Sequence, residues 1–278
     1  FSHYLPQSEI CQLNANAYRQ PVSVSPYLFS LLLRLKTLTE QTEGAFDPTA
    51  GQLVKAWGLF RQGTLRGEEV SPPSREKVHQ IVQEIGWSNV ELDTKPQTVT
   101  FLTPFVEIHL GAVGKGFIVD EVIGYLRKQG IEQALVNAGG SSIATIGTPP
   151  NSDHWHLGIA DPCDSANTLG YVLLQADECL STSGSMESAK TPNGERVCHL
   201  FDPRNGNPVA FHGSVSVLSP TALEGDALTT AFFVNGAAWT ETYCQHRPDI
   251  QALWIEVDED AIAPCLACFS ATQSRFLQ

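Results

Sequence analysis

Helix-like and strand-like segments follow one another irregularly along this chain of 278 residues, and no repeat of fixed length orders them. Segments with apolar residues at helical spacing are separated by short runs rich in β-branched and aromatic residues. A doubly wound parallel sheet needs a regular alternation of strand and helix, which this sequence lacks. The sequence therefore predicts an α+β fold with mixed, largely antiparallel sheets flanked by helices.

The expected elements can be placed by residue number. Helices are predicted over 8–20, 25–43, 115–129, 222–236 and 237–246, and at the ends of 44–58 and 68–86. Asp47 and Pro48 predict a cap-like start for the helix in 44–58. Strands are predicted over 98–102, 106–110 and 251–257, within 155–218, and on both sides of a glycine corner in 134–147. The change in composition near 66–74 is too weak to divide the chain, so we expect residues 1–278 to form a single domain.

The formal net charge of −13 bears on the partners of the chain. An acidic surface argues against nucleic acid as a partner, because phosphate backbones attract Lys and Arg. No stretch reaches the roughly 18–20 apolar residues that a membrane-spanning helix needs. The seven cysteines are odd in number and scattered, which fits free thiols better than a disulfide framework. A metal or redox role for the lone C-x-x-C, at Cys265 and Cys268, is the alternative.

A glycine-rich turn with the sequence GAVGKG overlaps the start of the helix predicted at 115–129. Gly111, Gly114 and Gly116 permit close backbone approach, and the start of the helix offers free N–H groups and the positive end of a dipole. Lys115 adds a positive charge. The turn matches neither the P-loop nor the dinucleotide fingerprint. It suits a phosphate or pyrophosphate, and a plain strand-to-helix turn is the alternative.

The segment EGDALTTAF, on the helix predicted at 222–236, places Asp226 and Thr230 four residues apart on one helix face. A carboxylate, a hydroxyl and nearby carbonyls are the hard oxygen ligands that Mg²⁺ prefers. The alternative is a first-turn acid that stabilises the helix, with a threonine bonded back to the chain. The pair therefore predicts either a metal site or a helix start.

Three further segments carry groups that could act in binding or catalysis. VNAGGSS contains a glycine corner at Gly139 and Gly140, for which a tight turn is the alternative. His199, in HLFDPRNGNPV, could act as a base or a nucleophile near neutral pH, although a single histidine on a strand is more often simply packed. The segment STSGS offers hydroxyls, among them that of Ser183, with a plain loop as the alternative.

The order and spacing of these segments are more specific than any one of them. Together with SEICQLNANA and EGAFDPTAGQLVKAWG, they make the chain resemble the ApbE-like flavin transferase family over about residues 2–257. The elements K-G-x-x-x-D, H-x-x-D-P-x-x-G and D-A-L-x-T are specific in combination. The resemblance implies an ApbE-like (T-fold-like) architecture, with an N-terminal strand of the family expected to be missing from residues 1–278.

The resemblance implies a bacterial enzyme that binds FAD and Mg²⁺, splits the pyrophosphate of FAD, and transfers FMN to a Thr or Ser hydroxyl of an acceptor protein as a phosphoester, with release of AMP. The implied Mg²⁺ ligands are the side chains of Asp226 and Thr230 and the backbone carbonyl of Ala112. His199 and Asp226 are the implied catalytic residues. The implied contacts to FAD are Trp57, Gly58, Ala112, Lys115, Gly139, Gly140, Ser183 and His199.

The chain departs from the family pattern at several positions. His109 stands where the family has Asp, Ser185 and Met186 stand where it has an acidic residue and Tyr, and Asn205 stands where it has Thr. These differences leave two alternatives to a transferase: a FAD pyrophosphatase, and a flavin-binding or scavenging protein without transferase activity. A serine hydrolase is excluded, because STSGSMESAKTP contains neither S-x-x-K nor K-T-G.

The resemblance also implies a place on the outer face of the bacterial inner membrane, reached through a lipid anchor on an N-terminal segment that residues 1–278 are expected to lack. The unpaired cysteines favour a reducing compartment instead. The sequence leaves the compartment open between these two.

Overall fold

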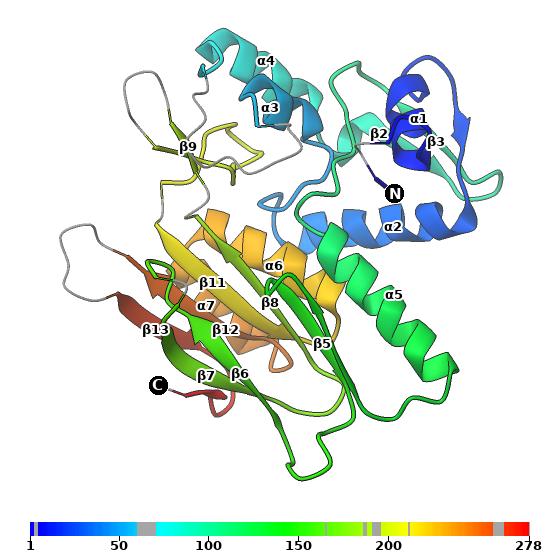
Figure 1. Ribbon diagram of the computed structural model, residues 1–278. Helices are drawn as coiled ribbons and strands as arrows, with labels where there is room; N and C mark the ends of the chain where they lie inside the picture. Colours follow the sequence, from blue (N-terminus) through cyan, green and yellow to red (C-terminus); the bar gives the residue numbers. More distant parts are fainter. Residues whose placement is uncertain are drawn as a thin grey trace. The chain divides into compact units, whose positions relative to one another are not determined.

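The computed structural model describes residues 1–2, 5–59, 71–164, 166–185, 188–190, 196–210, 212–257 and 264–277. The chain divides into two compact units (Figure 1). The first unit comprises Phe1–Leu110 and Glu187–Val209, and the second comprises Gly111–Met186 and Ala210–Gln278. One domain over residues 1–278 stays a prediction, because compact units within a chain can belong to a single domain.

The first unit combines helices with a small sheet and a hairpin. Its helices are α1 Glu9–Asn16, α2 Pro26–Gln41, α3 Gly51–Ala56 and α4 Arg75–Glu84, with a 3₁₀ turn at Trp87–Asn89. Its antiparallel sheet has the order β1 Val22–Ser23, β3 Thr98–Phe101 and β2 Val90–Asp93. The hairpin pairs β9 Ser188–Lys190 with β10 Arg196–Cys198.

Helix α2 has the start and the buried stripe that its sequence predicts. The Ser25 hydroxyl accepts a hydrogen bond of 3.1 Å from the Leu28 N–H, and Pro26 occupies the first turn, where no N–H partner is needed. The leucines expected on its inner face are buried: Leu28, Leu31, Leu32, Leu35 and Leu38. Local capping and apolar spacing therefore agree for this helix.

The prediction of a strand at 106–110 is wrong. Only Glu107 makes an isolated bridge there, with Ala50. Asn14 instead exchanges two side-chain hydrogen bonds of 2.9 Å with the backbone of Ile108. Since an asparagine from α1 satisfies backbone groups that a neighbouring strand would otherwise have to satisfy, the apolar alternation of this segment does not lead to a sheet.

The Asp47–Pro48 pair does not cap helix α3. The helix begins at Gly51, with Ala50 as its N-cap and no side-chain hydrogen bond to the cap. Asp47 Oδ1 instead accepts a hydrogen bond of 2.8 Å from the Thr49 N–H, which makes a local turn ahead of the helix. Burial raises the pKa of Asp47 from 3.8 to about 6, and the bonds from Thr49 lower it only in part.

Replacing Asp47 by Asn is expected to stabilise the protein at pH 7 and to change little at pH 4. The folded carboxyl releases its proton near pH 6 and the unfolded one near 3.8, so the folded state binds more protons between these values. The free energy of unfolding therefore falls as the pH rises through this window. The shift corresponds to about 3 kcal/mol at most. Because Asp47 is only half-buried, we expect about 1 kcal/mol after solvent screening.

Urea unfolding at pH 4 and pH 7 measures this difference, since Asn can still accept the Thr49 N–H bond. Asp93→Asn is the matched control, because Asp93 accepts the same kind of bond, from the Lys95 N–H (3.1 Å), at an exposed turn. A gain for Asp47→Asn that is equal at both pH values would show that the buried charge is not its cause.

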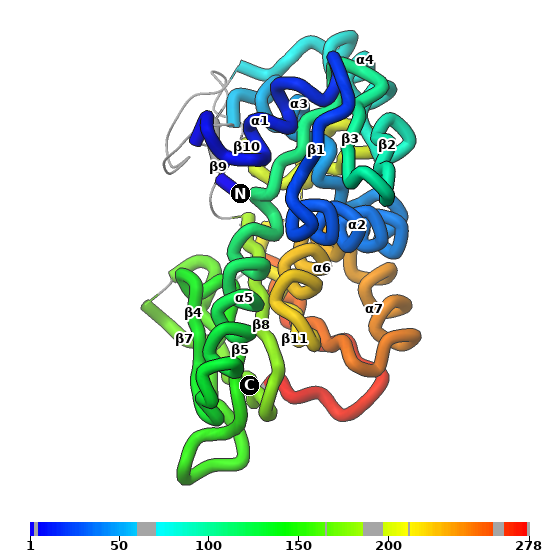
Figure 2. The backbone as a smooth tube through the Cα atoms, turned by 90° about the vertical axis from the view of Figure 1, so that its right-hand side faces the viewer, coloured from blue at the N-terminus to red at the C-terminus, as the bar shows by residue number. Residues whose placement is uncertain are grey.

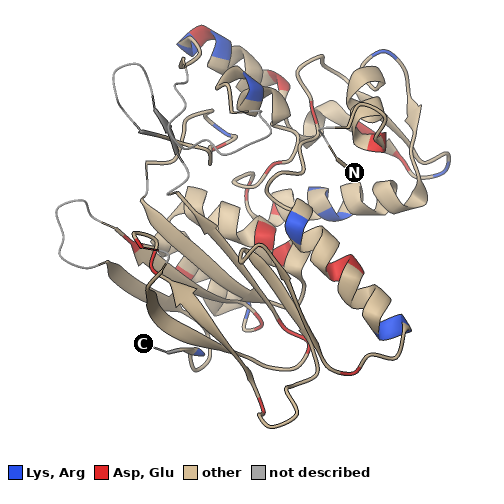
Figure 3. Ribbon diagram, in the orientation of Figure 1, with Lys and Arg blue, Asp and Glu red and all other residues tan. Residues whose placement is uncertain are grey.

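The second unit is built on a six-stranded antiparallel sheet with the order β13-β12-β11-β8-β5-β4. In that order the strands are Cys265–Phe269, Gln251–Glu256, Gly213–Ser219, Cys179–Gly184, Ser142–Ile146 and Ala134–Ala138. Apart from Glu256, these strands contain no Asp, Glu, Lys or Arg, and Figure 3 shows them almost uniformly tan. The sheet is therefore an apolar and nearly uncharged platform.

One face of this sheet is covered by helices and the other by a second sheet (Figure 2). The helices are α5 Gly114–Lys128, α6 Ala222–Asn235 and α7 Ala237–His246. The second sheet has the order β14 Phe276–Leu277, β7 Thr168–Leu174 and β6 Trp155–Ala160. Between the sheets lies an apolar core of Ile143, Ile159, Val172, Leu174, Leu180, Leu218, Leu253, Ile255 and Phe276.

The expected α+β class with largely antiparallel sheets is confirmed, as are the helices predicted at 115–129, 222–236 and 237–246. All seven cysteines are free thiols. Cys265 and Cys268 are three residues apart on β13, so their side chains leave opposite faces of the strand and cannot pair. Within the described residues, no helix has the length and apolarity to cross a membrane.

Candidate active site

Asp226 is a buried carboxylate at which two helices and a strand of the second unit meet. It lies in the second turn of α6 and is 6% exposed. Its Oδ2 accepts a hydrogen bond of 2.6 Å from the Gly116 N–H of α5. Its Oδ1 accepts a hydrogen bond of 2.6 Å from the Ser142 hydroxyl of β5. Both oxygens are therefore held in place by the fold.

The surroundings of Asp226 disfavour an uncompensated negative charge. Burial raises the pKa of Asp226 above the ordinary value of 3.8, while the hydrogen bonds from Ser142 and Gly116 and the charge of Lys115 lower it. The strands packed against α6 offer no cationic side chain. A buried carboxylate in such a place is stabilised by a nearby cation, and a metal ion is one such cation.

Position 116 accepts only glycine, because α5 and α6 touch there. A Cβ atom on Gly116 would lie 2.1 Å from the carbonyl oxygen of Ala222 and 2.9 Å from Asp226 Oδ2. No side chain fits into that space without moving a helix. The missing side chain lets the first turn of α5 reach α6, and this approach brings the Gly116 N–H onto the carboxylate.

Asp120, the acid of the K-G-x-x-x-D element, holds the start of α6. Its Oδ1 accepts a bond of 2.8 Å from the Ala222 N–H, and its Oδ2 accepts one of 3.0 Å from the Leu223 N–H. A carboxylate at the N-terminus of a helix satisfies free donors and complements the helix dipole. Gly116 and Asp120 are one turn apart on α5, so this element joins the two helices at two successive points.

Thr230 follows Asp226 by one turn of α6 and is 9% exposed. Residues four apart share a helix face, so the structure brings the two predicted metal ligands to one side of α6. The neighbouring Thr229 is engaged elsewhere, because its hydroxyl donates to the Asp226 carbonyl (2.8 Å) and shares a 2.8 Å bond with the Ser183 hydroxyl. Ser183, a predicted FAD contact, thus joins β8 to α6.

The glycine-rich turn leads directly into α5. Val113 is the N-cap of this helix and supplies no side-chain hydrogen bond to it. Lys115 is exposed in the first helical turn, and Ala112 is half-buried in the turn before it. Free N–H groups, the positive end of a helix dipole and a lysine together suit an anion. This anion-binding character lies next to Asp226, since Gly116 belongs to the same turn.

The corner between β4 and β5 requires glycine for its backbone conformation. Gly139 and Gly140 have φ values of +66° and +76°. The Gly140 N–H donates a bond of 2.7 Å to Asn137 Oδ1, which fixes the corner. No atom lies within 4 Å of a Cβ added at either glycine. Glycine is therefore favoured here by the backbone conformation and not by a lack of space. The exposed corner ends two residues before Ser142, and its backbone is accessible to a ligand.

Trp57, Gly58 and His199 belong to the first unit. The Trp57 side chain is buried, and its indole N–H donates a bond of 3.1 Å to the Gly206 carbonyl. Gly58 follows with a φ of +72°. His199 is half-buried and comes directly after β10. Their contact with FAD stays a prediction.

The segment DPRNG forms the turn that its sequence predicts. Asp202 accepts hydrogen bonds from the backbone and guanidinium of Arg204 (2.8–3.0 Å) and from the side-chain amide of Asn205 (3.0 Å). Gly206 has a φ of +76°, and a Cβ there would lie 2.4 Å from Val78 Cγ1 of α4. Asn205, one of the departures from the family pattern, therefore has a structural role in this turn.

Two other departures from the family pattern, Ser185 and His109, make backbone hydrogen bonds. Ser185 is 3% exposed and pairs with Gly213 across β8 and β11: its N–H donates to the carbonyl (3.0 Å), and its hydroxyl accepts from the N–H (2.9 Å). The His109 N–H donates a bond of 2.7 Å to the Pro48 carbonyl. Met186 lies outside the described residues. Ser185, the residue after β8, is thus bonded to the start of β11 and is buried away from solvent.

The donor set around Asp226 fits a hard divalent cation. A carboxylate has about four lone-pair sites, so at least one remains after the bonds from Gly116, Ser142 and Ser181. Thr230 adds a hydroxyl on the same face, and oxygen donors of this kind suit Mg²⁺. In the part of the chain that the structure describes, no three His, Cys, Asp or Glu side chains form a metal-binding group, so a nitrogen- or sulfur-rich site does not compete there.

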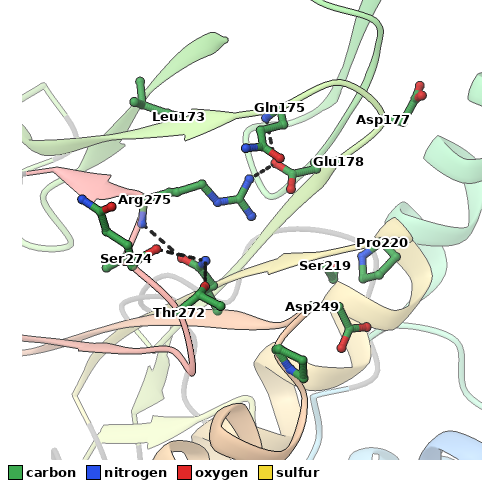
Figure 4. Close-up of a pocket in the computed structure, with 13 residues that line it drawn as sticks. Leu173, Gln175, Asp177, Glu178, Ser219, Pro220, Asp249, Thr272, Ser274 and Arg275 are labelled. Carbon is green, nitrogen blue, oxygen red and sulfur yellow. Dashed lines mark hydrogen bonds and ion pairs between the residues drawn. The ribbon is translucent and has the colours of Figure 1, made fainter. Parts of the chain in front are cut away.

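A separate cavity of about 690 Å³ in the second unit has a different character (Figure 4). It lies among the end of β7, the start of β12 and the segment around Arg275. Its charged groups pair with side chains of the chain itself: Arg275 with Glu178, and Asp249 with Arg247 (2.7 Å). Because these pairs use the charges that would select a ligand, we place the candidate active site at Asp226.

Known proteins are similar to this chain in both sequence and fold. Residues 1–254 match the ApbE family. A FAD:protein FMN transferase from Klebsiella pneumoniae is 32% identical over 257 residues, which are 92% of this chain and 77% of that protein. The crystal structure of the ApbE protein from Thermotoga maritima has a TM-score of 0.78 and 29% identity, covering 88% of this chain and 78% of that one.

A second solved structure, the flavin transferase ApbE from Vibrio cholerae, has a TM-score of 0.80 and 26% identity, and it covers 98% of this chain and 84% of that one. The fold is similar to that of solved ApbE structures, and Asp226 lies within the part of the chain that matches the family model. The chain belongs to the ApbE family.

Proposed function

We propose that this chain is a Mg²⁺-dependent FAD:protein FMN transferase. It binds FAD, cleaves the pyrophosphate, and attaches FMN by a phosphoester bond to a Thr or Ser hydroxyl of an acceptor protein, with release of AMP. The chain is a transferase of the ApbE family. Relatives that are named FAD:protein FMN transferase support FAD and a protein as its two substrates. The observation that carries the proposal is the buried Asp226 carboxylate bonded to the first turn of α5.

The proposal assigns one Mg²⁺ ion to Asp226, Thr230 and the backbone carbonyl of Ala112. A bound Mg²⁺ would supply charge neutralisation at the phosphoryl oxygens and at the departing AMP. Asp226 needs no rearrangement to bind a cation, because the Gly116 N–H and the Ser142 hydroxyl already fix its two oxygens. This preorganisation is what distinguishes Asp226 from an ordinary acid at a helix start.

Binding of the pyrophosphate is assigned to Lys115 and to the first turn of α5. The turn presents backbone N–H groups and the positive end of the helix dipole, and Lys115 adds a mobile positive charge. The exposed Gly139–Gly140 corner offers backbone groups to the same substrate. Trp57, Gly58 and Ser183 are assigned to FAD by the family resemblance.

The transfer exchanges one P–O bond for another. The oxygen of the acceptor hydroxyl bonds to the phosphorus of the FMN half, the bond from that phosphorus to the bridging oxygen breaks, and AMP leaves with the bridging oxygen. His199 is assigned either to accept the hydroxyl proton or to carry FMN transiently on its imidazole. Both roles need a neutral imidazole.

The test is FAD turnover by the purified protein in Mg²⁺ and in EDTA, with AMP followed by chromatography and protein-bound flavin followed by in-gel fluorescence. The acceptor used is a protein that the Klebsiella transferase modifies. We expect AMP only with Mg²⁺, together with covalent FMN on the acceptor. A Thr→Ala or Ser→Ala variant of the acceptor site is the control, and it should remain non-fluorescent.

Two results would favour the alternatives. AMP and free FMN without labelled acceptor would identify a FAD pyrophosphatase. Tight FAD binding without AMP release in Mg²⁺ would identify a flavin-binding or scavenging protein and would overturn the proposed chemistry.

A further inference from the structure

We propose that Ser142 is a positioning residue for the cation site, whose hydroxyl fixes the orientation of the Asp226 carboxylate so that its remaining lone pairs face the ion. The inference rests on the Mg²⁺ site of the proposed function and adds a residue to it. Ser142 does not contact the cation or FAD in this proposal. It acts only through Asp226.

The geometry of the two bonds supports this role. The Ser142 hydroxyl lies 2.6 Å from Asp226 Oδ1, and the Gly116 N–H lies 2.6 Å from Oδ2. Hydrogen bonds to an ionised carboxylate are short and about twice as strong as neutral ones. One bond on each oxygen sets the plane of the carboxylate. Without the Ser142 bond, the carboxylate keeps the Gly116 bond and the weaker contribution of the Ser181 hydroxyl, and it is freer to turn about its Cβ–Cγ axis.

The donor itself is rigid. Ser142 is 0% exposed and is the first residue of β5. It pairs with Ala138 of β4 on one side and with Ser181 of β8 on the other. A hydroxyl anchored between two neighbouring strands cannot follow a rotating side chain. The sheet thus holds one oxygen of Asp226 while helix α5 holds the other.

The same sheet contains a matched control for Ser142. Ser216 of β11 is 1% exposed, and its hydroxyl shares a bond of 2.8 Å with Thr182 of β8. Both serines are buried and bonded through their hydroxyls within one sheet. Ser216 has a neutral partner, whereas Ser142 has the carboxylate. A loss that arises only from a missing buried hydroxyl should therefore be similar in the two alanine variants.

The experiment is a titration of each purified, metal-free protein with Mn²⁺, in which free Mn²⁺ is followed by electron paramagnetic resonance without FAD. Mn²⁺ takes oxygen ligands as Mg²⁺ does and is directly visible. We expect Ser142→Ala to bind Mn²⁺ about 10- to 100-fold more weakly than the wild type, the range for loss of a partner behind a metal ligand. Ser216→Ala is expected to bind within about 2-fold of the wild type, because it keeps that partner.

Thermal unfolding of the metal-free variants accompanies the titration: both alanines should lower the midpoint, and a cooperative transition in each shows that the Mn²⁺ comparison is made on folded protein. If Ser142→Ala does not fold, Ser142→Cys replaces it, because a thiol keeps the volume but is a weaker donor. Equal Mn²⁺ affinity in the wild type and the Ser142 variant overturns the positioning role. So does an equal loss in the Ser142 and Ser216 variants, which would indicate general loosening of the sheet. A wild type that binds no Mn²⁺ would instead contradict the proposed metal site itself.

Discussion

Replacing Asp226 by Asn is expected to lower the Mg²⁺-dependent turnover of FAD by at least about 100-fold while leaving the fold intact. Losing a partner behind a metal ligand already costs about 10- to 100-fold in affinity or activity, and losing the charged ligand itself should cost more. Asp226 is the only acidic side chain in the proposed ligand set. A neutral amide would leave the cation without a charged protein ligand.

The fold should survive this substitution because the hydrogen bonds can be re-formed. The amide oxygen of Asn can accept the Gly116 N–H bond, and its NH₂ group can donate to the Ser142 hydroxyl, which accepts as well as donates. The variant also removes a buried charge whose burial outweighs the hydrogen bonds and the Lys115 charge that stabilise it. We therefore expect the free energy of unfolding of the metal-free protein at pH 7 to be unchanged or higher.

AMP release and urea unfolding, measured on the same preparations, separate the two effects. Asp177→Asn is the control: it makes the same change of charge in the second unit, at an exposed residue whose ion pair with Arg127 (2.7 Å) contributes little. It should leave turnover within about 2-fold of the wild type, because an exposed ion pair is worth little. Turnover of Asp226→Asn within about 3-fold of the wild type would show that this carboxylate does not hold the catalytic cation.

The sequence was sufficient to identify the residues on which this prediction depends. The spacing of Asp226 and Thr230 predicted one helix face, and the glycines on both sides of Lys115 predicted a close approach at the start of a helix. The structure shows the two residues on α6 and the close approach at Gly116. These features are local, so helix periodicity and the demands of glycine reveal them without knowledge of the tertiary structure.

The sequence alone could not predict hydrogen-bond partners that are far apart in the chain and meet only in the folded protein. No sequence pattern connects Ser142 with Asp226, because the two residues are 84 positions apart in the chain. In the sequence, Asp120 is only a member of the K-G-x-x-x-D element. Its role as a cap on α6 depends on Ala222 and Leu223, which are about 100 residues away and meet it through the fold. The mistaken strand at 106–110 has the same origin, since Asn14 lies 94 residues from Ile108.

The family elements therefore combine assembly with chemistry. In K-G-x-x-x-D, the lysine is exposed, the glycine allows the close approach of α6, and the aspartate caps α6. In H-x-x-D-P-x-x-G, Asp202 and Gly206 build a turn that follows His199. A motif match thus predicts the fold around a site at least as strongly as it predicts ligands. The test of each assignment must separate stability from binding.

Gly116→Ala is expected to be the most destabilising single substitution at this site, with a loss of about 3 kcal/mol or more in the free energy of unfolding. Adding a methylene group to a well-packed interior typically costs 1–3 kcal/mol when the neighbours can move. Here the added Cβ would lie 2.1 Å from the carbonyl oxygen and 2.5 Å from the carbonyl carbon of Ala222, which are backbone atoms of α6. Helices α5 and α6 would have to separate, and the Gly116 bond to Asp226 would be lost.

Gly124→Ala, eight residues later in α5, is the matched control. A Cβ at Gly124 has no atom within 4 Å, so the same chemical change meets no obstacle there. In a helix interior, alanine is favoured over glycine by about 1 kcal/mol, and Gly124→Ala should therefore be neutral or stabilising. Urea unfolding of both variants gives the comparison. If Gly116→Ala lost no more than about 1 kcal/mol, α5 and α6 would not be in the close contact that presents the Gly116 N–H to Asp226.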